Sequence, residues 1–171
     1  MRLFKKQTRQ VIKKKARRNL SSKFSQEKRV YVVDTSAIIN QFVSRLIKKG
    51  ITGKIIIPNS VIAELENLAN KGREEGFIGL DEIAGFHKLK HAFPIQPYFE
   101  GLRPNEMQIR FAKSGEIDAI IRETALKHRA ILITADLVQA KTAQAYNIQV
   151  LFLKPKPEKP KKKFLSRFWK R

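Results

Sequence analysis

The sequence predicts an α/β domain with a central parallel β-sheet between two layers of helices, a three-layer α/β/α sandwich. Strand-like and helix-like segments alternate along residues 30–153, which is the order that βαβ units produce. The strand-like segments, such as Val30–Val33, are apolar at successive positions, and strands buried on both faces are typical of parallel sheets. A chain of 171 residues with 42% hydrophobic residues is long enough to build one such domain around its own core.

The first expected elements are each closed by a residue that interrupts regular structure. Val30–Val33 consists of β-branched and aromatic residues, which strands prefer. Apolar residues then recur at helical spacing over 37–49, and Gly50 ends that pattern. A second strand is expected over 54–57, where Pro58 stops a run of isoleucines.

The next segment is expected to contain a capped helix, a break and a second helix. Asn59 or Ser60 can cap a helix that runs to about residue 71, because both side chains accept hydrogen bonds from main-chain N–H groups. Glycines follow at positions 72, 76 and 79. Since glycine disfavours helix interiors, we expect the chain to break there and a new helix to run over roughly 80–91.

The remaining elements continue the alternation of strands and helices. A third strand is expected over 95–99, although Pro94 and Pro97 weaken it. Helices are expected over 104–113, 116–129 and 137–147, and strands over 130–134 and 149–153.

Most of the positive charge lies at the two ends of the chain. The net charge is +21; residues 1–29 hold 12 Lys and Arg residues against one acid, and residues 154–171 hold nine against one. Residues 30–153 keep a net charge of only +2. Basic tails most often bind nucleic acid, although a solubilising tail without a partner is the plainer alternative. We therefore expect a basic N-terminal arm, a folded domain and a basic C-terminal tail with these boundaries.

Several protein classes are excluded by what the sequence lacks. There is no cysteine, hence no disulfide framework and no thiolate metal site. The longest apolar runs have the length of strands rather than of membrane spans, and the basic N-terminus lacks the apolar core of a signal peptide. We expect a cytoplasmic protein and no membrane partner. The alternative, binding to an anionic membrane surface, comes from Phe164, Leu165, Phe168 and Trp169, which share one helical face among basic residues.

Four acidic residues are expected at the carboxyl ends of the strands. Asp34 and Asp136 follow strands closely, whereas Glu64 and Asp118 lie in the opening turns of helices. Ligands of open parallel sheets bind beyond the carboxyl ends of the strands, so this topology brings the four carboxylates, here called the acidic cluster, to one edge. Each acid taken alone has a plainer explanation as a helix cap, a partner of the helix dipole or a solvated charge.

The joint placement of the acidic cluster favours a metal site. Several carboxylates at one concave edge repel each other and normally require a cation. With no cysteine and only three histidines, an all-oxygen site selects Mg²⁺ or Mn²⁺, and such a site suits phosphodiester cleavage. Thr35, Ser36 and Thr134 are sequence neighbours of the acids and could orient a carboxylate, a water or a phosphate oxygen.

Four short motifs resemble those of the PIN domain (PilT N-terminus) family. They are Asp-Thr-Ser at 34–36, Val-Ile-Ala-Glu-Leu-Glu at 61–66, Gly-Glu-Ile-Asp-Ala at 115–119 and Thr-Ala-Asp at 134–136. The resemblance covers about residues 30–153 and implies the strand order 3-2-1-4-5. The stretch 69–80 looks most like the PIN domains of archaeal proteins that also carry an ATPase and a KH module. This sequence has neither module, so ATP-driven activity is not expected.

The resemblance implies a metal-dependent nuclease, either an endoribonuclease or a structure-specific nuclease, and RNA is favoured over DNA as the substrate. The implied metal ligands are Asp34, Glu64, Asp118 and Asp136, with Glu116 as a fifth candidate; the implied catalytic residues are the same four together with Ser36 and Thr134. Many such domains are toxins held by a protein inhibitor, so an inhibitor and a homodimer stay open as partners. The long basic tails favour an RNA-processing or ribosome-associated role. The alternative is a non-catalytic RNA-binding or ribosome-associated scaffold.

Overall fold

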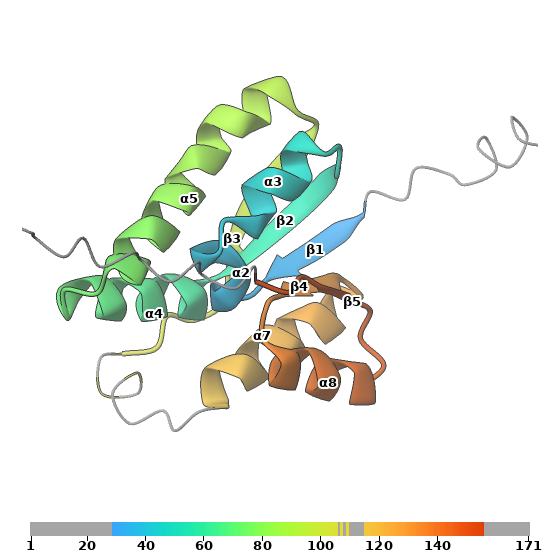
Figure 1. Ribbon diagram of the computed structural model, residues 1–171. Helices are drawn as coiled ribbons and strands as arrows, with labels where there is room; N and C mark the ends of the chain where they lie inside the picture. The colour runs from blue at the N-terminus through green and yellow to red at the C-terminus, as the bar shows by residue number, and fades with distance from the viewer. Residues whose placement is uncertain (1–28, 106, 108, 110–114, 156–171) are drawn as a thin grey trace, which may run out of the picture.

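Five parallel strands form one sheet in the order β3-β2-β1-β4-β5 (Figure 1). The computed structural model describes residues 29–155 apart from 106, 108 and 110–114. The strands are β1 Val30–Val33, β2 Gly53–Pro58, β3 Ile95–Glu100, β4 Ile131–Thr134 and β5 Val150–Phe152. The helices are α2 Thr35–Ile39, α3 Phe42–Lys48, α4 Asn59–Asn70, α5 Glu74–Ala92, α7 Glu116–Lys127 and α8 Leu137–Ala145. The parallel sheet and the strand order expected from the sequence are confirmed.

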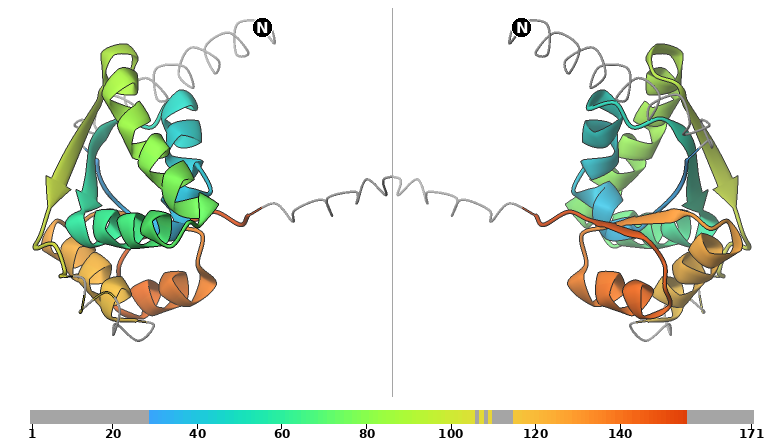
Figure 2. Two further views of the ribbon diagram at one scale, coloured as in Figure 1. Left: turned by 90° about the vertical axis from the view of Figure 1, so that its left-hand side faces the viewer. Right: turned by 90° about the vertical axis from the view of Figure 1, so that its right-hand side faces the viewer.

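The helices cover the sheet on both faces. Helices α3 and α5 pack on one side of the strands, and α7 and α8 lie on the other (Figures 1 and 2). Right-handed crossovers produce this arrangement, because the chain moves toward one edge through β1, β2 and β3 and then returns for β4 and β5. The central strands are buried on both faces, and Val32, Ile56 and Leu132 have no exposed surface. The three-layer α/β/α architecture is therefore as predicted.

The single helix expected over 37–49 is two helices. Helix α2 ends at Ile39, and α3 begins at Phe42 after Gln41, whose φ of 54° is left-handed. The buried carboxylate of Glu82, on α5, accepts hydrogen bonds from the N–H and the hydroxyl of Ser44, both at 2.8 Å. This distant side chain satisfies the first turn of α3 and supports a new helix start, although the apolar spacing continues across the break.

The break expected at Gly76 and Gly79 does not occur, because both residues lie inside α5. A Cβ at Gly76 would lie 2.3 Å from the main-chain nitrogen of Ala69 and 2.6 Å from the carbonyl oxygen of Leu65. A Cβ at Gly79 would lie 2.3 Å from a methyl carbon of the Leu65 side chain. These glycines therefore allow α4 and α5 to pack closely, and this contact outweighs their low helix propensity.

We expect Gly76→Ala to lower the melting temperature. Its added methyl group collides with backbone atoms of α4, and overpacking of this kind costs roughly 1–3 kcal/mol, or about 2–4 °C for each kcal/mol in a domain of this size. Gly85→Ala on the same helix is the matched control, because its Cβ meets nothing within 4 Å and alanine favours a helix by about 1 kcal/mol. Thermal unfolding of both variants tests this, and equal shifts would contradict the close packing.

Neither side chain expected to cap α4 does so. The N-cap residue is Pro58, without a side-chain cap. The amide of Asn59 instead donates to the carbonyl oxygen of Gly101 at 2.5 Å, and the hydroxyl of Ser60 is fully buried without a hydrogen-bond partner in the described part of the chain. The cap prediction was wrong because Asn59 bonds the segment after β3 and Ser60 is buried in the fold.

Three expected segments lie mainly outside the described residues. They are the helix over 104–113, the basic N-terminal arm 1–29, and the C-terminal tail 154–171 with its aromatic and basic residues. Within the residues that are described, no helix has the length and hydrophobicity needed to cross a bilayer.

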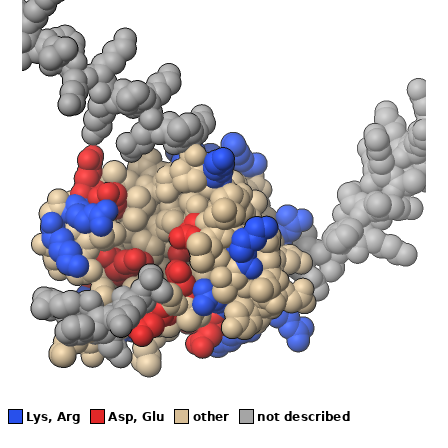
Figure 3. All heavy atoms as spheres, turned by 60° about the horizontal axis from the view of Figure 1, so that its bottom comes forward, with Lys and Arg blue, Asp and Glu red and all other residues tan. Residues whose placement is uncertain are grey.

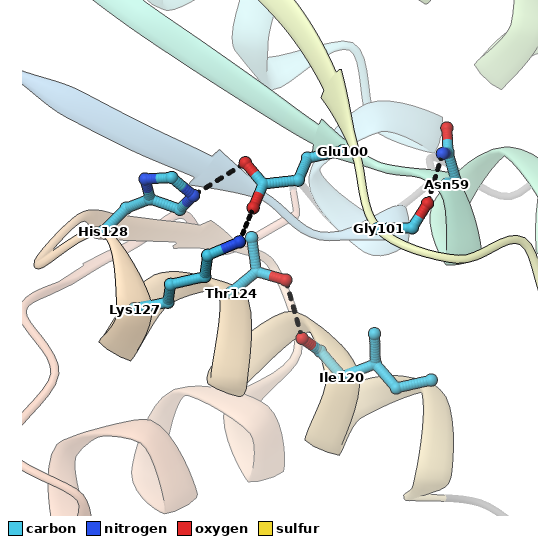
Figure 4. A network of polar contacts seen from close by, with 7 residues as sticks. All are labelled: Asn59, Glu100, Gly101, Ile120, Thr124, Lys127 and His128. Carbon is cyan, nitrogen blue, oxygen red and sulfur yellow. Dashed lines mark hydrogen bonds and ion pairs between the residues drawn. The ribbon is translucent and has the colours of Figure 1, made fainter.

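A polar network ties edge strand β3 to the end of α7 (Figure 4). The carboxylate of Glu100 accepts a hydrogen bond from Lys127, and the Nε2 of His128 lies 2.7 Å from its other oxygen. The hydrogen bond from Lys127 is the largest cause that lowers the pKa of Glu100, and the hydrogen bond from His128 lowers it further. The network holds the far end of α7 against the sheet, while the first turn of this helix carries Asp118.

Candidate metal centre

Asp34 lies at the end of β1 and is almost completely buried, with 4% of its surface exposed. Its main-chain N–H donates to the carbonyl oxygen of Ile133 at 3.0 Å, so it is still held by the neighbouring strand β4. It occupies the N-cap position of α2, yet its side chain makes no cap hydrogen bond. The helix-cap alternative therefore does not explain this carboxylate.

Two hydroxyl groups fix one oxygen of Asp34. Both Ser36 and Thr134 donate hydrogen bonds to its Oδ2, that of Thr134 being 2.7 Å long. The same hydroxyls accept main-chain N–H groups of the β4–α8 connection, Ser36 from Ala135 at 2.9 Å and Thr134 from Asp136 at 3.0 Å. The network orients the Asp34 carboxylate and joins it to the chain segment that carries Asp136.

Glu64 reaches the same region from α4. It is half-buried, and its Oε2 accepts a hydrogen bond of 2.6 Å from the hydroxyl of Thr35, the residue after Asp34. Thr35 is itself buried. A side chain at the start of α2 therefore orients this second carboxylate.

The first turn of α7 supplies Asp118, which is half-buried. Glu116 begins the same turn and is exposed. Residues two apart on a helix do not face each other, so the helix does not bring Glu116 to the side occupied by Asp118.

Asp136 is exposed and caps α8. Its Oδ1 accepts hydrogen bonds from the N–H groups of Val138, at 2.6 Å, and Gln139, at 3.1 Å. The helix-cap explanation given for the acids taken singly therefore applies to Asp136. The cap hydrogen bonds use one carboxylate oxygen, and they fix the orientation of the other.

The four acids act on one another electrostatically. Burial is the main cause that raises the pKa of Asp34, Glu64 and Asp118. The charge of Asp136 raises the pKa of Asp34 further, and the charge of Asp34 does the same for Glu64 and Asp118. Asp34 therefore interacts with each of the other three acids, which come from segments distant in sequence.

Acidic side chains run across one face of the domain, flanked by Lys and Arg side chains (Figure 3). In the described ranges, no three acidic or histidine side chains are already arranged to hold a metal ion. The donors of the acidic cluster are all oxygen, which suits Mg²⁺ or Mn²⁺, and mutual repulsion of the carboxylates favours a bound cation. The chemistry of the cluster thus fits a hard divalent cation.

Two residues next to the acidic cluster were not singled out from the sequence. Gln139, on α8, is fully buried and donates from its side-chain Nε2 to the carbonyl oxygen of Asp118 at 3.1 Å. Arg122, on α7, donates to the side-chain oxygen of Gln139 at 2.6 Å. Arg122 lies four residues after Asp118, and Gln139 lies three residues after Asp136. This spacing was the one signal available in the sequence, and ordinary helix surfaces show the same spacing.

Residues 31–151, most of the chain, match the PIN domain family. A KH and PIN-domain containing protein of Methanocaldococcus jannaschii is 39% identical over 128 residues, which is 74% of this chain and 20% of that protein. A Holliday junction branch migration ATPase of Sulfolobus acidocaldarius is 24% identical over 122 residues, 71% of this chain and 22% of that protein. The solved structure of a domain of a functionally unknown protein from M. jannaschii is similar, with a TM-score of 0.71 at 38% identity over 77% of this chain and 95% of that one.

The similarity concerns a domain rather than whole proteins, since the chain spans about a fifth of the length of these two curated relatives. PIN domains are commonly metal-dependent nucleases. The family match over 31–151, the strand order and the similarity to the M. jannaschii domain agree. The chain belongs to the PIN domain family.

Proposed function

We propose that this domain is an Mg²⁺- or Mn²⁺-dependent endoribonuclease whose metal ligands are Asp34, Glu64, Asp118 and Asp136. The observation that carries the proposal is the placement of Asp34, which is only 4% exposed. The Thr134 hydroxyl that binds its carboxylate also accepts from the N–H of Asp136, and the next residue, Thr35, donates to Glu64. Burying a charged carboxylate is costly unless it is paired. A cation that several of these acids share would remove that cost.

The hydroxyl groups have a defined part in this proposal. Ser36 and Thr134 hold one oxygen of Asp34 and leave the carboxylate in a fixed orientation, while Thr35 does the same for Glu64. A divalent cation supplies the positive charge that stabilises charge developing on phosphate oxygens. The chain itself contributes preorganised ligands, so little rearrangement of Asp34 is required when the cation binds.

An open cavity of about 400 Å³ along α4 is a candidate path for the substrate strand. Its lining includes Asn67, Asn70, Lys71 and Arg103. Asn67 lies three residues after Glu64 and is therefore its neighbour on the helix surface. Amides can bond to base edges and Lys71 to a phosphate. Arg103 is ion-paired with Glu66, which also lines the cavity, so the two amides and Lys71 are the groups that we propose contact a nucleotide adjacent to the cleaved bond.

The charge distribution supports a nucleic-acid substrate. The arm 1–29 and the tail 154–171 together carry +19 of the net charge of +21. Cations in such segments bind phosphates without sequence preference, which compensates for the repulsion between an acidic site and a polyanion. RNA is the substrate that we propose.

Incubation of the full chain with labelled single-stranded RNA, duplex RNA, DNA strands and a four-way DNA junction tests the proposal. We expect cleavage of RNA in Mn²⁺ or Mg²⁺ and none in EDTA. Cleavage confined to DNA would overturn the RNA assignment but keep the nuclease. Tight binding without cleavage of any substrate would instead support the non-catalytic RNA-binding or ribosome-associated scaffold.

A further inference from the structure

The fully buried Gln139 contacts the segments of two acids at once. Its main-chain N–H donates to the Asp136 carboxylate, and its side-chain Nε2 donates to the carbonyl oxygen of Asp118. Its Oε1 accepts from Arg122. One residue of α8 therefore links its own N-cap to the first turn of α7.

We propose that Gln139 is a positioning residue that holds Asp118 and Asp136 in one metal site and fixes Arg122 beside Asp118. The proposal rests on the function proposed above. Gln139 touches neither the metal nor the substrate in this role, because it acts through the residues that it bonds.

The burial of this amide argues for a positional role. A buried amide is costly unless it is hydrogen-bonded, and an apolar side chain could fill the same space without that requirement. Both polar atoms of Gln139 are used, at 3.1 Å and 2.6 Å. Such a pair of directed contacts fixes the register of α7 against α8, which apolar packing alone does less strictly.

Gln139 bonds the main-chain carbonyl oxygen of Asp118. It therefore positions the backbone from which the Asp118 side chain extends. Asp118 lies in the first turn of α7. The hydrogen bond from Gln139 attaches this turn to α8, whose N-cap is Asp136. This hydrogen bond thereby links the main chain of Asp118 directly to the helix that Asp136 caps.

Arg122 adds a charge to this arrangement. It lies one helical turn after Asp118, on the same side of α7, so its positive charge is near the negative charge of that acid. The 2.6 Å hydrogen bond to Gln139 fixes its guanidinium. Arg122 thus offsets part of the repulsion among the acids, and Gln139 keeps it near them.

The test is the affinity for Mn²⁺ of the full chain and of Gln139→Met, measured by electron paramagnetic resonance of free Mn²⁺. Methionine keeps the length of the side chain and removes its hydrogen bonds. We expect the affinity to fall by about tenfold or more, as changes to residues that orient metal ligands do. The control Gln144→Met changes an exposed glutamine of the same helix and should bind Mn²⁺ like the parent.

A loss of stability alone must not be mistaken for a positional effect. Ile47→Ala creates a cavity at a fully buried residue of α3, and we expect it to lower the melting temperature without changing the affinity for Mn²⁺. The two variants are compared at the same loss of melting temperature. If Gln139→Met then lost no more affinity for Mn²⁺ than Ile47→Ala, Gln139 would only stabilise the fold and the positioning role would be overturned.

Gln139→Glu provides a second variant with an opposite electrostatic expectation. It keeps an acceptor for Arg122, whose charge favours the ionised form, but places an oxygen against the carbonyl of Asp118. The added negative charge alone would strengthen Mn²⁺ binding, whereas displacement of Asp118 weakens it. We expect weaker binding, and tighter binding would overturn the positioning role.

A parent that does not bind Mn²⁺ would overturn the proposed function as well, whereas equal binding by parent and Gln139→Met would overturn this inference alone.

Discussion

Asp34→Asn is expected to lower the rate of RNA cleavage by more than about a hundredfold while RNA binding survives. Asp34 is the most buried acid of the cluster, and two hydroxyls fix its carboxylate. Residues that merely orient a metal ligand typically account for about 10–100-fold in metal affinity or activity, so loss of a ligand should cost more. Asparagine has nearly the same shape, and its side-chain oxygen can still accept from Ser36 and Thr134. Initial cleavage rates at saturating Mn²⁺, with binding measured separately in EDTA, test this expectation.

The chain offers a matched control for that substitution. Asp81 is the one aspartate outside the acidic cluster, and it is exposed on α5. Asp81→Asn should cleave RNA at the parent rate. A parent-like rate for Asp34→Asn would remove this residue from the catalytic site, and an equal loss in both variants would indicate a general effect of charge.

The same variant should stabilise the metal-free protein, increasingly so as the pH rises. Burial and the charge of Asp136 raise the pKa of Asp34 above its ordinary value of 3.8. A raised pKa means that the folded state binds the proton more tightly than the unfolded state does. The free energy of unfolding is therefore highest below the ordinary pKa and falls as the pH rises through the folded pKa. Asparagine carries no charge and escapes that loss.

Melting temperatures in EDTA across pH 4 to 8 measure this difference. The advantage of Asp34→Asn over the parent should grow with pH, by about 2–4 °C for each kcal/mol of relieved repulsion and burial cost. Asp81→Asn should follow the parent at every pH. An advantage that shrinks as the pH rises would mean that the folded pKa of Asp34 is lowered, with its charge already paired inside the protein.

Mn²⁺ should reverse the order of stability. A ligand that binds only the folded state stabilises it by about 2.7 kcal/mol at a hundredfold excess over its Kd, which is roughly 5–10 °C for a domain of this size. We expect this shift for the parent and a much smaller one for Asp34→Asn. A parent whose melting temperature does not respond to Mn²⁺ would remove the physical basis of the proposed metal site.

The sequence was sufficient to predict that Asp34 and Asp136 lie at the carboxyl ends of strands. Asp34 and Asp136 follow segments whose apolar runs identify buried strands, and parallel strands end at a common edge. The structure then showed differences among acids that look alike in sequence. Asp34 is buried and bonded by hydroxyls, whereas Asp136 is exposed and caps α8.

The supporting residues could not be predicted in the same way. Ser36 and Thr134 were candidates as sequence neighbours of acids, and the structure gives them a common partner in Asp34. Gln139 had no distinguishing local pattern, because its partners Asp118 and Arg122 lie 21 and 17 residues away. A side chain whose role depends on distant partners leaves no trace in local periodicity.

The sequence by itself determined the alternation of strands and helices, the buried parallel sheet and the edge that collects the acidic cluster. These features follow from hydrophobic spacing and chain connectivity, which are local properties. Only the tertiary structure decided that Gly76 lies within a helix, that the chain breaks at Gln41, and that Gln139 connects two acids. The reason is that each of these depends on close packing or hydrogen bonds between segments distant in sequence, and the free energy of those contacts exceeds the local preferences of the residues involved.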